Sequence, residues 1–341
     1  MHLVNALPGV AAQGLIWGIM AIGVYITFRI LDVADLTVDG TMATGGAAFI
    51  IPYIFFTFTI GVMLVMAEIA LGRRGRGSAV SAMMRVSGRW SAPLGVFAVL
   101  TSFLILSYYS VVGGWCIKYT IDAFTGTGII ADAQTLGAHF GSFVSNSAVS
   151  YGYLLVFLLM TAFVVLRGVE AGIEKLSKVL MPSLFILMLI LIVRGVTLPG
   201  GWKGVEFLFT PRWEDFNATA LFNAMGFCFF SLSLGAGTMI TYGSYLNPKA
   251  DLPSSVGWVA FLAILSSVLG GLMVMPAVFA FNLDPTAGPG LTFVTMPAIF
   301  AQMPMGQLFA IFFYICLLVA ALTSSVSMLE ACTVLLTQTF S

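Results

Sequence analysis

The residues best suited to chemistry lie in a polar stretch inside an otherwise apolar run. Two serines and two glycines fall within residues 229–238, between apolar half-segments at residues 221–228 and 239–246. In hydrocarbon every backbone N–H and C=O must be satisfied within the protein, so a broken helix is tolerated only where it is buried or lines a cavity. Freed carbonyls can face a cation, while the amides that start the next helix favour an anion. The stretch therefore predicts a discontinuous helix of the kind that forms binding sites in secondary transporters.

Hydroxyl groups inside two other apolar runs are further candidates. Thr323 and Ser324 lie well inside the last run, and their oxygens suit a hard cation such as sodium. Serine and threonine in membrane helices often bond back to the preceding turn, and the residues alone favour that interpretation. Tyr109 also lies well inside its run, where its hydroxyl needs a partner.

The composition is that of a polytopic membrane protein whose partner is the lipid bilayer. Apolar residues make up 60% of the 341 residues, charged residues 8%, and the mean hydropathy is +1.04, which is far from the usage of soluble domains. Runs of about 20 apolar residues recur along the whole chain. They predict an all-α fold with about eight transmembrane helices, at residues 11–31, 47–70, 93–122, 150–166, 179–198, 218–246, 255–281 and 306–335.

The placement of Lys and Arg predicts the orientation of these spans. Five arginines crowd the loop after the second span and three basic residues follow the fourth, whereas residues 123–149 and 282–305 carry none. By the positive-inside rule the basic loops are cytoplasmic. The loop after the fifth span is a mixed exception. We therefore expect a multi-pass protein of the inner (plasma) membrane with both termini in the cytoplasm.

Several classes of function are disfavoured. The four cysteines lie in apolar runs at unrelated spacings, and neither of the two histidines falls in a predicted span, so the cysteines are expected to be small core residues. Nothing resembles a nucleotide-binding loop, a nucleophile with its base or a catalytic carboxylate pair. We expect neither an enzyme nor a nucleic-acid-binding protein. The first apolar run has no charged segment before it and is expected to be a retained span.

From about residue 45 onward, a series of motifs resembles bacterial members of the sodium:neurotransmitter symporter family. The motifs follow the family order, at GGAAFIIPY (45–53), EIALGRRG (68–75), SYYSVVGGW (107–115), 168–182, 227–245, 284–300 and ALTSS (321–325). This resemblance implies a sodium-coupled symporter for amino acids or related small amines that works by alternating access. It also implies a partial five-helix inverted-repeat fold with a discontinuous sixth helix.

The resemblance implies particular site residues. The sodium ligands that it assigns are Ser231, Ala320, Thr323 and Ser324. Tyr109 matches the tyrosine whose hydroxyl bonds the substrate carboxylate, with Tyr108 as the alternative register. The substrate-binding positions carried over are Ile105, Tyr109, Phe230, Ser231, Ser233, Ala236, Ser324 and Met328. Ala236 occupies a place that is bulkier in some relatives, which favours a large apolar or aromatic amino acid.

The seventh span departs from the family pattern. Ala263 stands where the first sodium site uses an asparagine or aspartate, so that site is expected to be weak or missing. Ser267, with Ser266 as the alternative register, falls where some members coordinate chloride and others carry a carboxylate. Chloride at Ser267 is therefore a second candidate ion.

Residues 1–44 do not fit this family. The strings at residues 23–32 and 35–40 resemble instead the start of a permease subunit of an ABC-type importer. We therefore divide the chain into an ABC-permease-like segment, residues 1–44, and a symporter-like domain, residues 45–341, which ends after the family's eighth helix. Two alternatives stay open: a permease subunit of an ABC-type amino-acid importer, and a chimeric or truncated chain with impaired transport. Association with a second copy of the chain is also left open.

Five carboxylates call for an interpretation because ionisable residues at membrane depth are functional candidates by default. Glu68 and Glu330 lie near the expected cytoplasmic ends of their spans, which favours a solvated or gate-lining role. Asp32, Asp35 and Asp39 favour a loop at the outer surface. The alternative for these three aspartates is that they replace cation ligands from the family's first helix.

Overall fold

The computed structural model of the chain describes residues 46–129, 132–212, 214, 216–283 and 291–340, and this part is helical without strands. Its helical elements, in chain order, are α3 (Ala47–Phe56), η1 (Thr57–Gly61), α4 (Val62–Gly75), α5 (Ala79–Ser87), η2 (Arg89–Ser91), α6 (Ala92–Thr125), α7 (Ala133–Ser145), α8 (Ser147–Leu166), η3 (Val169–Glu174), α9 (Lys175–Val196), α10 (Trp202–Phe209), α11 (Ala218–Ser231), α12 (Thr238–Tyr245), α13 (Leu252–Ala280), η5 (Leu291–Thr295), α14 (Met296–Gln302) and α15 (Gly306–Phe340).

Six continuous helical stretches are long and apolar enough to cross a membrane. They are Ala47–Gly75, Arg89–Thr125, Ser147–Leu166, Gly172–Val196, Leu252–Ala280 and Gly306–Gln338. They coincide with six of the predicted spans, which confirms a multi-pass helical membrane protein. The span predicted at residues 218–246 is divided into α11 and α12. The span predicted at residues 11–31, the segment 1–44 and its three aspartates lie outside the described residues.

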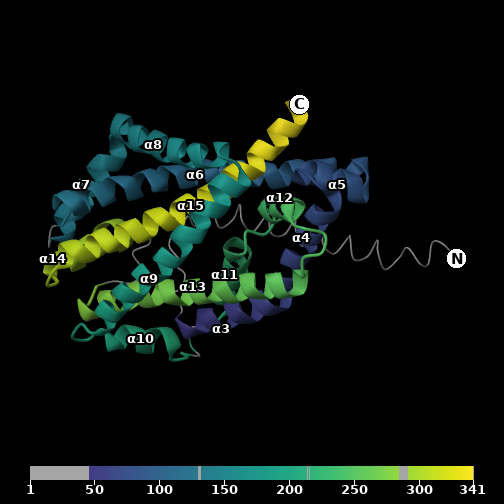
Figure 1. Ribbon diagram of the computed structural model, residues 1–341. Helices are drawn as coiled ribbons and strands as arrows, with labels where there is room; N and C mark the ends of the chain where they lie inside the picture. Colours follow the sequence, from purple (N-terminus) through teal and green to yellow (C-terminus); the bar gives the residue numbers. More distant parts are fainter. Residues whose placement is uncertain (1–45, 130–131, 213, 215, 284–290, 341) are drawn as a thin grey trace.

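The helices form two groups around the divided span. Helices α6, α8 and α15 pack on one another, whereas α11 packs on α3 and α12 on α4. Figure 1 shows α6, α8 and α15 along one side and α3, α10 and α13 along the opposite side. The divided span α11–α12 therefore has neighbours on which its backbone groups can find partners.

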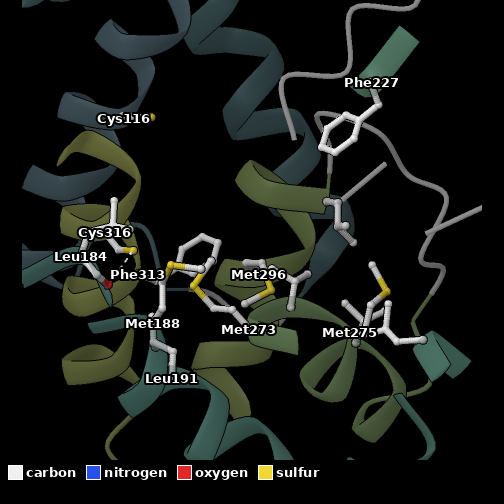
Figure 2. Packing of buried hydrophobic residues seen from close by; sticks show 14 of the residues in the cluster. Cys116, Leu184, Met188, Leu191, Phe227, Met273, Met275, Met296, Phe313 and Cys316 are labelled. Carbon is white, nitrogen blue, oxygen red and sulfur yellow. Dashed lines mark hydrogen bonds between the residues drawn. The ribbon is translucent and has the colours of Figure 1, made fainter. Parts of the chain in front are cut away.

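The core of this arrangement is rich in sulfur-containing side chains. Figure 2 shows Met188 of α9, Met273 of α13, Met296 of α14 and Cys316 of α15 in one buried cluster. Methionine is unbranched and polarisable, so it fills irregular gaps between helices that cross at different angles. All four cysteines are buried and free, which confirms that they are small core residues.

Helices α4 and α12 approach so closely that only glycine fits at the crossing. A Cβ atom at Gly72 would lie 1.9 Å from the carbonyl oxygen of Ile240, and one at Gly243 would lie 2.4 Å from that of Ile69. Each helix therefore supplies one glycine that accepts the backbone of the other. This crossing fixes α12, the second half of the divided span, against α4.

We predict that Gly72→Ala destabilises the protein by about 1–3 kcal/mol, because the added methyl group forces α4 and α12 apart. Thermal unfolding in detergent micelles measures the effect. Gly152→Ala on α8 is the matched control, since a Cβ there meets nothing within 4 Å. Equal unfolding temperatures for the two variants would contradict the close crossing.

Candidate substrate and ion site

The span that the sequence predicted to be broken is broken. Helix α11 ends at Ser231 and α12 begins at Thr238. Three residues between them have positive φ: Ser233 (54°), Gly235 (78°) and Gly237 (72°). Glycine reaches this conformation at little cost, whereas it is uncommon for serine. The two glycines noted in the sequence are thus what allows the chain to leave one helix and enter the next.

A buried carboxylate holds the broken segment from the α4 side. The Gly235 N–H donates to Glu68 Oε1 at 2.9 Å, and Glu68 is only 3% exposed. The second carboxylate oxygen, Oε2, has no hydrogen-bond partner in the described part of the chain. The solvated role expected for Glu68 is therefore wrong, whereas the alternative gate-lining role stays a prediction. It rested on distance from the helix end, but α12 packs alongside α4 and covers that position.

Glu330 is also buried rather than solvated. Its side chain accepts a hydrogen bond from the Tyr245 hydroxyl at 2.5 Å, and it is 7% exposed. The neighbouring Tyr242 hydroxyl donates to Ser327 at 2.8 Å. Both bonds join α12 to α15, so the second half of the broken span is held on two sides.

Tyr109 meets α15 at the position that the resemblance assigned to substrate. Its side chain lies beside that of Ser324, and it packs on a buried cluster that contains Ile105 and Met328. Four of the predicted substrate-binding residues, from α6 and α15, therefore lie together. Ser324 itself is exposed.

Two of the predicted sodium ligands on α15, Ala320 and Thr323, have their oxygens close together. The Thr323 hydroxyl donates to the carbonyl oxygens of Ala320 (3.0 Å) and Val319 (3.1 Å) within its own helix. This is the back-bonding that the residues alone favoured. Because a hydroxyl that donates its hydrogen keeps its lone pairs, the bond does not prevent Thr323 from binding a cation.

Three hydroxyls from three different helices meet beside the end of α11. The Tyr53 hydroxyl of α3 lies 3.1 Å from Ser231 Oγ and 3.2 Å from Ser267 Oγ of α13. Tyr53 is fully buried. Ser266, the alternative register, bonds only to the Ala263 carbonyl of its own helix. Sequence reasoning missed Tyr53, which ends the quoted GGAAFIIPY motif. The available signal was that a buried tyrosine hydroxyl usually has a hydrogen-bond partner.

The remaining predicted residues are more dispersed. Phe230 is 42% exposed and Ala236 is 5% exposed, while the Ser233 carbonyl accepts a hydrogen bond from the Thr238 hydroxyl at 3.3 Å. In the described residues no hydrogen bond joins Ser231 to Thr323 or Ser324. The hydroxyl-bearing residues of the candidate site therefore form two groups. One contains Tyr109 and residues of α15, and the other contains Tyr53, Ser231 and Ser267.

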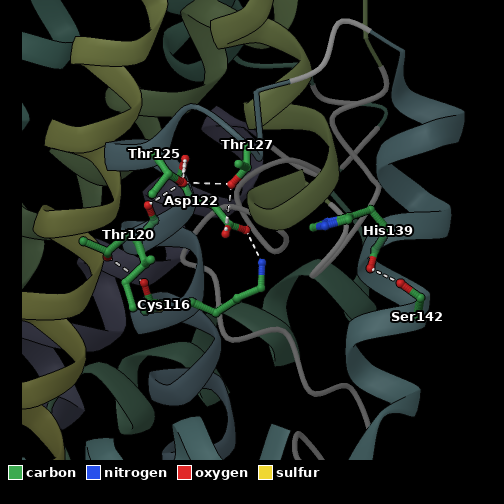
Figure 3. Close-up of polar contacts among 9 residues, drawn as sticks. Cys116, Thr120, Asp122, Thr125, Thr127, His139 and Ser142 are labelled. Atoms are coloured by element: carbon green, nitrogen blue, oxygen red, sulfur yellow. Dashed lines mark hydrogen bonds and ion pairs between the residues drawn. The ribbon is translucent and has the colours of Figure 1, made fainter. Parts of the chain in front are cut away.

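A polar cluster at the C-terminal end of α6 takes no part in either group. Lys118 pairs with Asp122, whose other oxygen accepts a hydrogen bond from the Thr127 hydroxyl at 3.4 Å. Figure 3 shows His139 of α7 directed toward this pair. The side chains of Lys118 and Asp122 are 15% and 10% exposed. The cluster closes the end of α6 against α7.

The comparison with known families agrees with this geometry. A sequence profile of the sodium:neurotransmitter symporter family matches residues 38–133 and 139–341, which is most of the chain. The chain belongs to the sodium:neurotransmitter symporter family. This is a family of transporters, not of enzymes. Membership confirms the resemblance seen in the motifs.

Individual relatives point the same way. An uncharacterized sodium-dependent transporter of Bacillus subtilis, YhdH, is 39% identical over 287 residues, which cover 84% of this chain and 64% of YhdH. The sodium- and chloride-dependent GABA transporter ine of Drosophila melanogaster is 26% identical over 334 residues, covering 84% of this chain and 35% of ine. The crystal structure of MhsT in complex with L-phenylalanine superposes with a TM-score of 0.81 at 34% identity, covering 96% of this chain and 74% of MhsT.

These matches bear on the two ends of the chain in different ways. The chain spans less than two thirds of the length of YhdH. The profile match begins at residue 38, inside the string at 35–40, and the division between residues 44 and 45 stays a prediction. None of these relatives supports the alternative of an ABC-type permease subunit.

We predict that Glu68→Leu loosens the broken segment, because the Gly235 N–H is then buried without an acceptor. Leaving a buried donor without a partner costs about 1–3 kcal/mol, so both the unfolding temperature and amide protection at residues 232–238 should fall. Glu68→Gln keeps an acceptor oxygen and should lose less. Hydrogen exchange with mass spectrometry in micelles measures the protection.

The matched control is Glu174→Leu, which removes an exposed carboxylate paired with Lys178 and should change little. If Glu68→Leu and Glu174→Leu exchange alike at residues 232–238, the carboxylate does not hold the segment.

Proposed function

We propose that this chain carries the substrate and ion site of a sodium-coupled amino-acid symporter that works by alternating access. The observation that carries the proposal is the broken α11–α12 span, with the neighbouring side chains of Tyr109 and Ser324 on α6 and α15. Broken helices at such sites direct freed carbonyls toward ions and helix N-terminal amides toward anionic groups of the substrate. The likeness to MhsT, whose structure holds L-phenylalanine, supports an α-amino acid as the substrate class.

The proposed roles follow from the chemistry of each group. The Tyr109 hydroxyl donates to the substrate carboxylate, and Ala320, Thr323 and Ser324 supply oxygens to one sodium ion. Ile105, Phe230, Ser233, Ala236 and Met328 contact the rest of the substrate. Because Ala236 adds little volume, the side-chain pocket suits a large apolar or aromatic amino acid.

The proposed orientation places the basic loops inside the cell. In this proposal the protein lies in the inner (plasma) membrane. The arginine-rich turn around α5 and the segment around η3 then face the cytoplasm. Arg73 and Arg76 donate to carbonyl oxygens of Ala250 and Ser244 at that end of α12. This placement, with both termini in the cytoplasm, supports inward release on the α5 side.

We further propose chloride as a second ion, bound by the hydroxyls of Tyr53, Ser231 and Ser267. Hydroxyl hydrogens are suitable donors to an anion, and the Ser231 and Ser267 oxygens lie 3.1 and 3.2 Å from the Tyr53 hydroxyl oxygen. Both serine hydroxyls donate to carbonyl oxygens of their own helices in this structure, so they would turn toward the anion when it binds. The similarity to ine, which is named as chloride-dependent, supports this ion. A chloride there would place negative charge beside the end of α11.

We predict that Thr323→Val raises the sodium concentration for half-maximal L-phenylalanine binding about tenfold. Loss of one oxygen ligand costs about 1–2 kcal/mol, and each 1.4 kcal/mol is a factor of ten. Scintillation proximity binding of labelled L-phenylalanine, with sodium against potassium, measures it. Thr333→Val is the control, since Thr333 also bonds back within α15 but lies ten residues further on. Sodium-independent binding by the wild type would contradict the proposed coupling.

We predict that Ser267→Glu makes L-phenylalanine binding independent of chloride, because a fixed carboxylate supplies the charge that the anion would bring. The wild type should bind several-fold more weakly when gluconate replaces chloride. Ser266→Glu is the control, because Ser266 makes no bond to Tyr53 and should leave the chloride dependence in place. A wild type indifferent to chloride would remove this ion from the proposal.

A further inference from the structure

Helix α6 presents one continuous face to the broken segment and the proposed pocket. Ala98, Ser102, Ile105 and Tyr109 follow at intervals of four, three and four residues, which places them on one side of an α-helix. At one end of this face, a Cβ atom added to Gly237 would lie 3.4 Å from Ala98 Cβ. At the other end the Tyr109 side chain lies beside that of Ser324.

Ser102 crosses from this face to the broken segment. Its hydroxyl donates to the Ala236 carbonyl oxygen at 2.6 Å, and Ser102 is completely buried. Ala236 lies between the end of α11 and the start of α12, where a carbonyl must find a partner other than the regular helical one. The bond therefore satisfies one of the acceptors that the break sets free.

The other serines and threonines of α6 behave differently. The hydroxyls of Thr101, Ser107, Ser110, Thr120 and Thr125 each donate to the carbonyl oxygen four residues earlier in α6. Such bonding to the preceding turn is common for serine and threonine in membrane helices. Ser102 is the exception, because its hydroxyl donates to the broken segment and not to the preceding turn of α6.

The bond lies between two residues of the proposed pocket. Ser102 is one turn before Ile105 on α6, and its acceptor is the backbone of Ala236 itself. Ile105 and Ala236 are 8% and 5% exposed. The distance between the α6 wall and Ala236 therefore depends on a single short hydrogen bond rather than on side-chain packing alone.

We propose that Ser102 is a positioning residue that sets the width of the pocket between Ile105 and Ala236, and thereby the size of the amino-acid side chain that is accepted. This inference rests on the proposed function. Without the Ser102 hydroxyl, the Ala236 carbonyl has no donor at this position, and the broken segment is free to move relative to α6. The pocket then discriminates less between small and large side chains.

The test compares binding of labelled L-phenylalanine and L-alanine to Ser102→Ala, Ser102→Thr and wild type in micelles with sodium. Ser102→Ala should weaken L-phenylalanine binding about tenfold, equivalent to about 1.4 kcal/mol. The ratio of the two dissociation constants should also narrow about threefold or more. Ser102→Thr keeps the hydroxyl and should restore the ratio. Ser107→Ala, which removes an exposed hydroxyl that bonds within α6, is the matched control.

Amide hydrogen exchange at residues 232–240 is the second readout, and it needs no substrate. Ser102→Ala should exchange faster there than Ser107→Ala. If Ser102 had a merely structural role, Ser102→Ala would reduce the folded fraction and weaken the binding of both amino acids by the same factor. An equal factor, or unchanged binding, overturns the proposal. If the wild type binds neither amino acid, the proposed function fails, and unchanged exchange in Ser102→Ala then overturns the positioning role as well.

Discussion

The structure depends on one constraint, which is that a broken backbone inside a membrane must have its polar groups satisfied by the protein. Between Ser231 and Thr238 the helical ladder is interrupted, and two partners from outside replace part of it. Glu68 accepts the Gly235 N–H, and Ser102 donates to the adjacent Ala236 carbonyl. Because buried unpaired groups cost several kcal/mol each in hydrocarbon, the positions of α4 and α6 are tied to that of the break.

The two sides hold the broken span in different ways. On the α4 side, the backbone crossing at Gly72 and Gly243 is too close for any larger residue, so α4 and α12 are expected to move as one body. Toward α6 and α15 the described polar links are side-chain hydrogen bonds, such as Tyr242 to Ser327. Such bonds can be exchanged for others at small net cost. In the proposed mechanism, α12 and α4 would therefore rock together against α6 and α15.

The sequence was sufficient to predict features that belong to a single segment, but it did not predict contacts between distant segments. The apolar runs and the glycine-serine stretch were sufficient to predict six spans and the break, because hydropathy and helix interruption are properties of a single segment. Tyr53 and Glu68 were missed or misjudged, since their partners lie 178 and 167 residues away. Periodicity along α3 or α4 carries no information about which helix crosses them. Ser102 was missed for the same reason, as its acceptor is 134 residues distant.

The cluster of hydroxyls from Tyr53, Ser231 and Ser267 also affects how many sodium ions the site can hold. Ser231, assigned by resemblance as a sodium ligand, is engaged by Tyr53, and the Ser267 hydroxyl donates to the Ala263 carbonyl at 2.8 Å. Ala263 supplies no side-chain oxygen where the family uses an amide or carboxylate. A cation beside Ser231 would therefore lack the side-chain oxygen that the family supplies from the position of Ala263. The oxygens of Ala320, Thr323 and Ser324 do not depend on that helix, so the proposed coupling rests on α15.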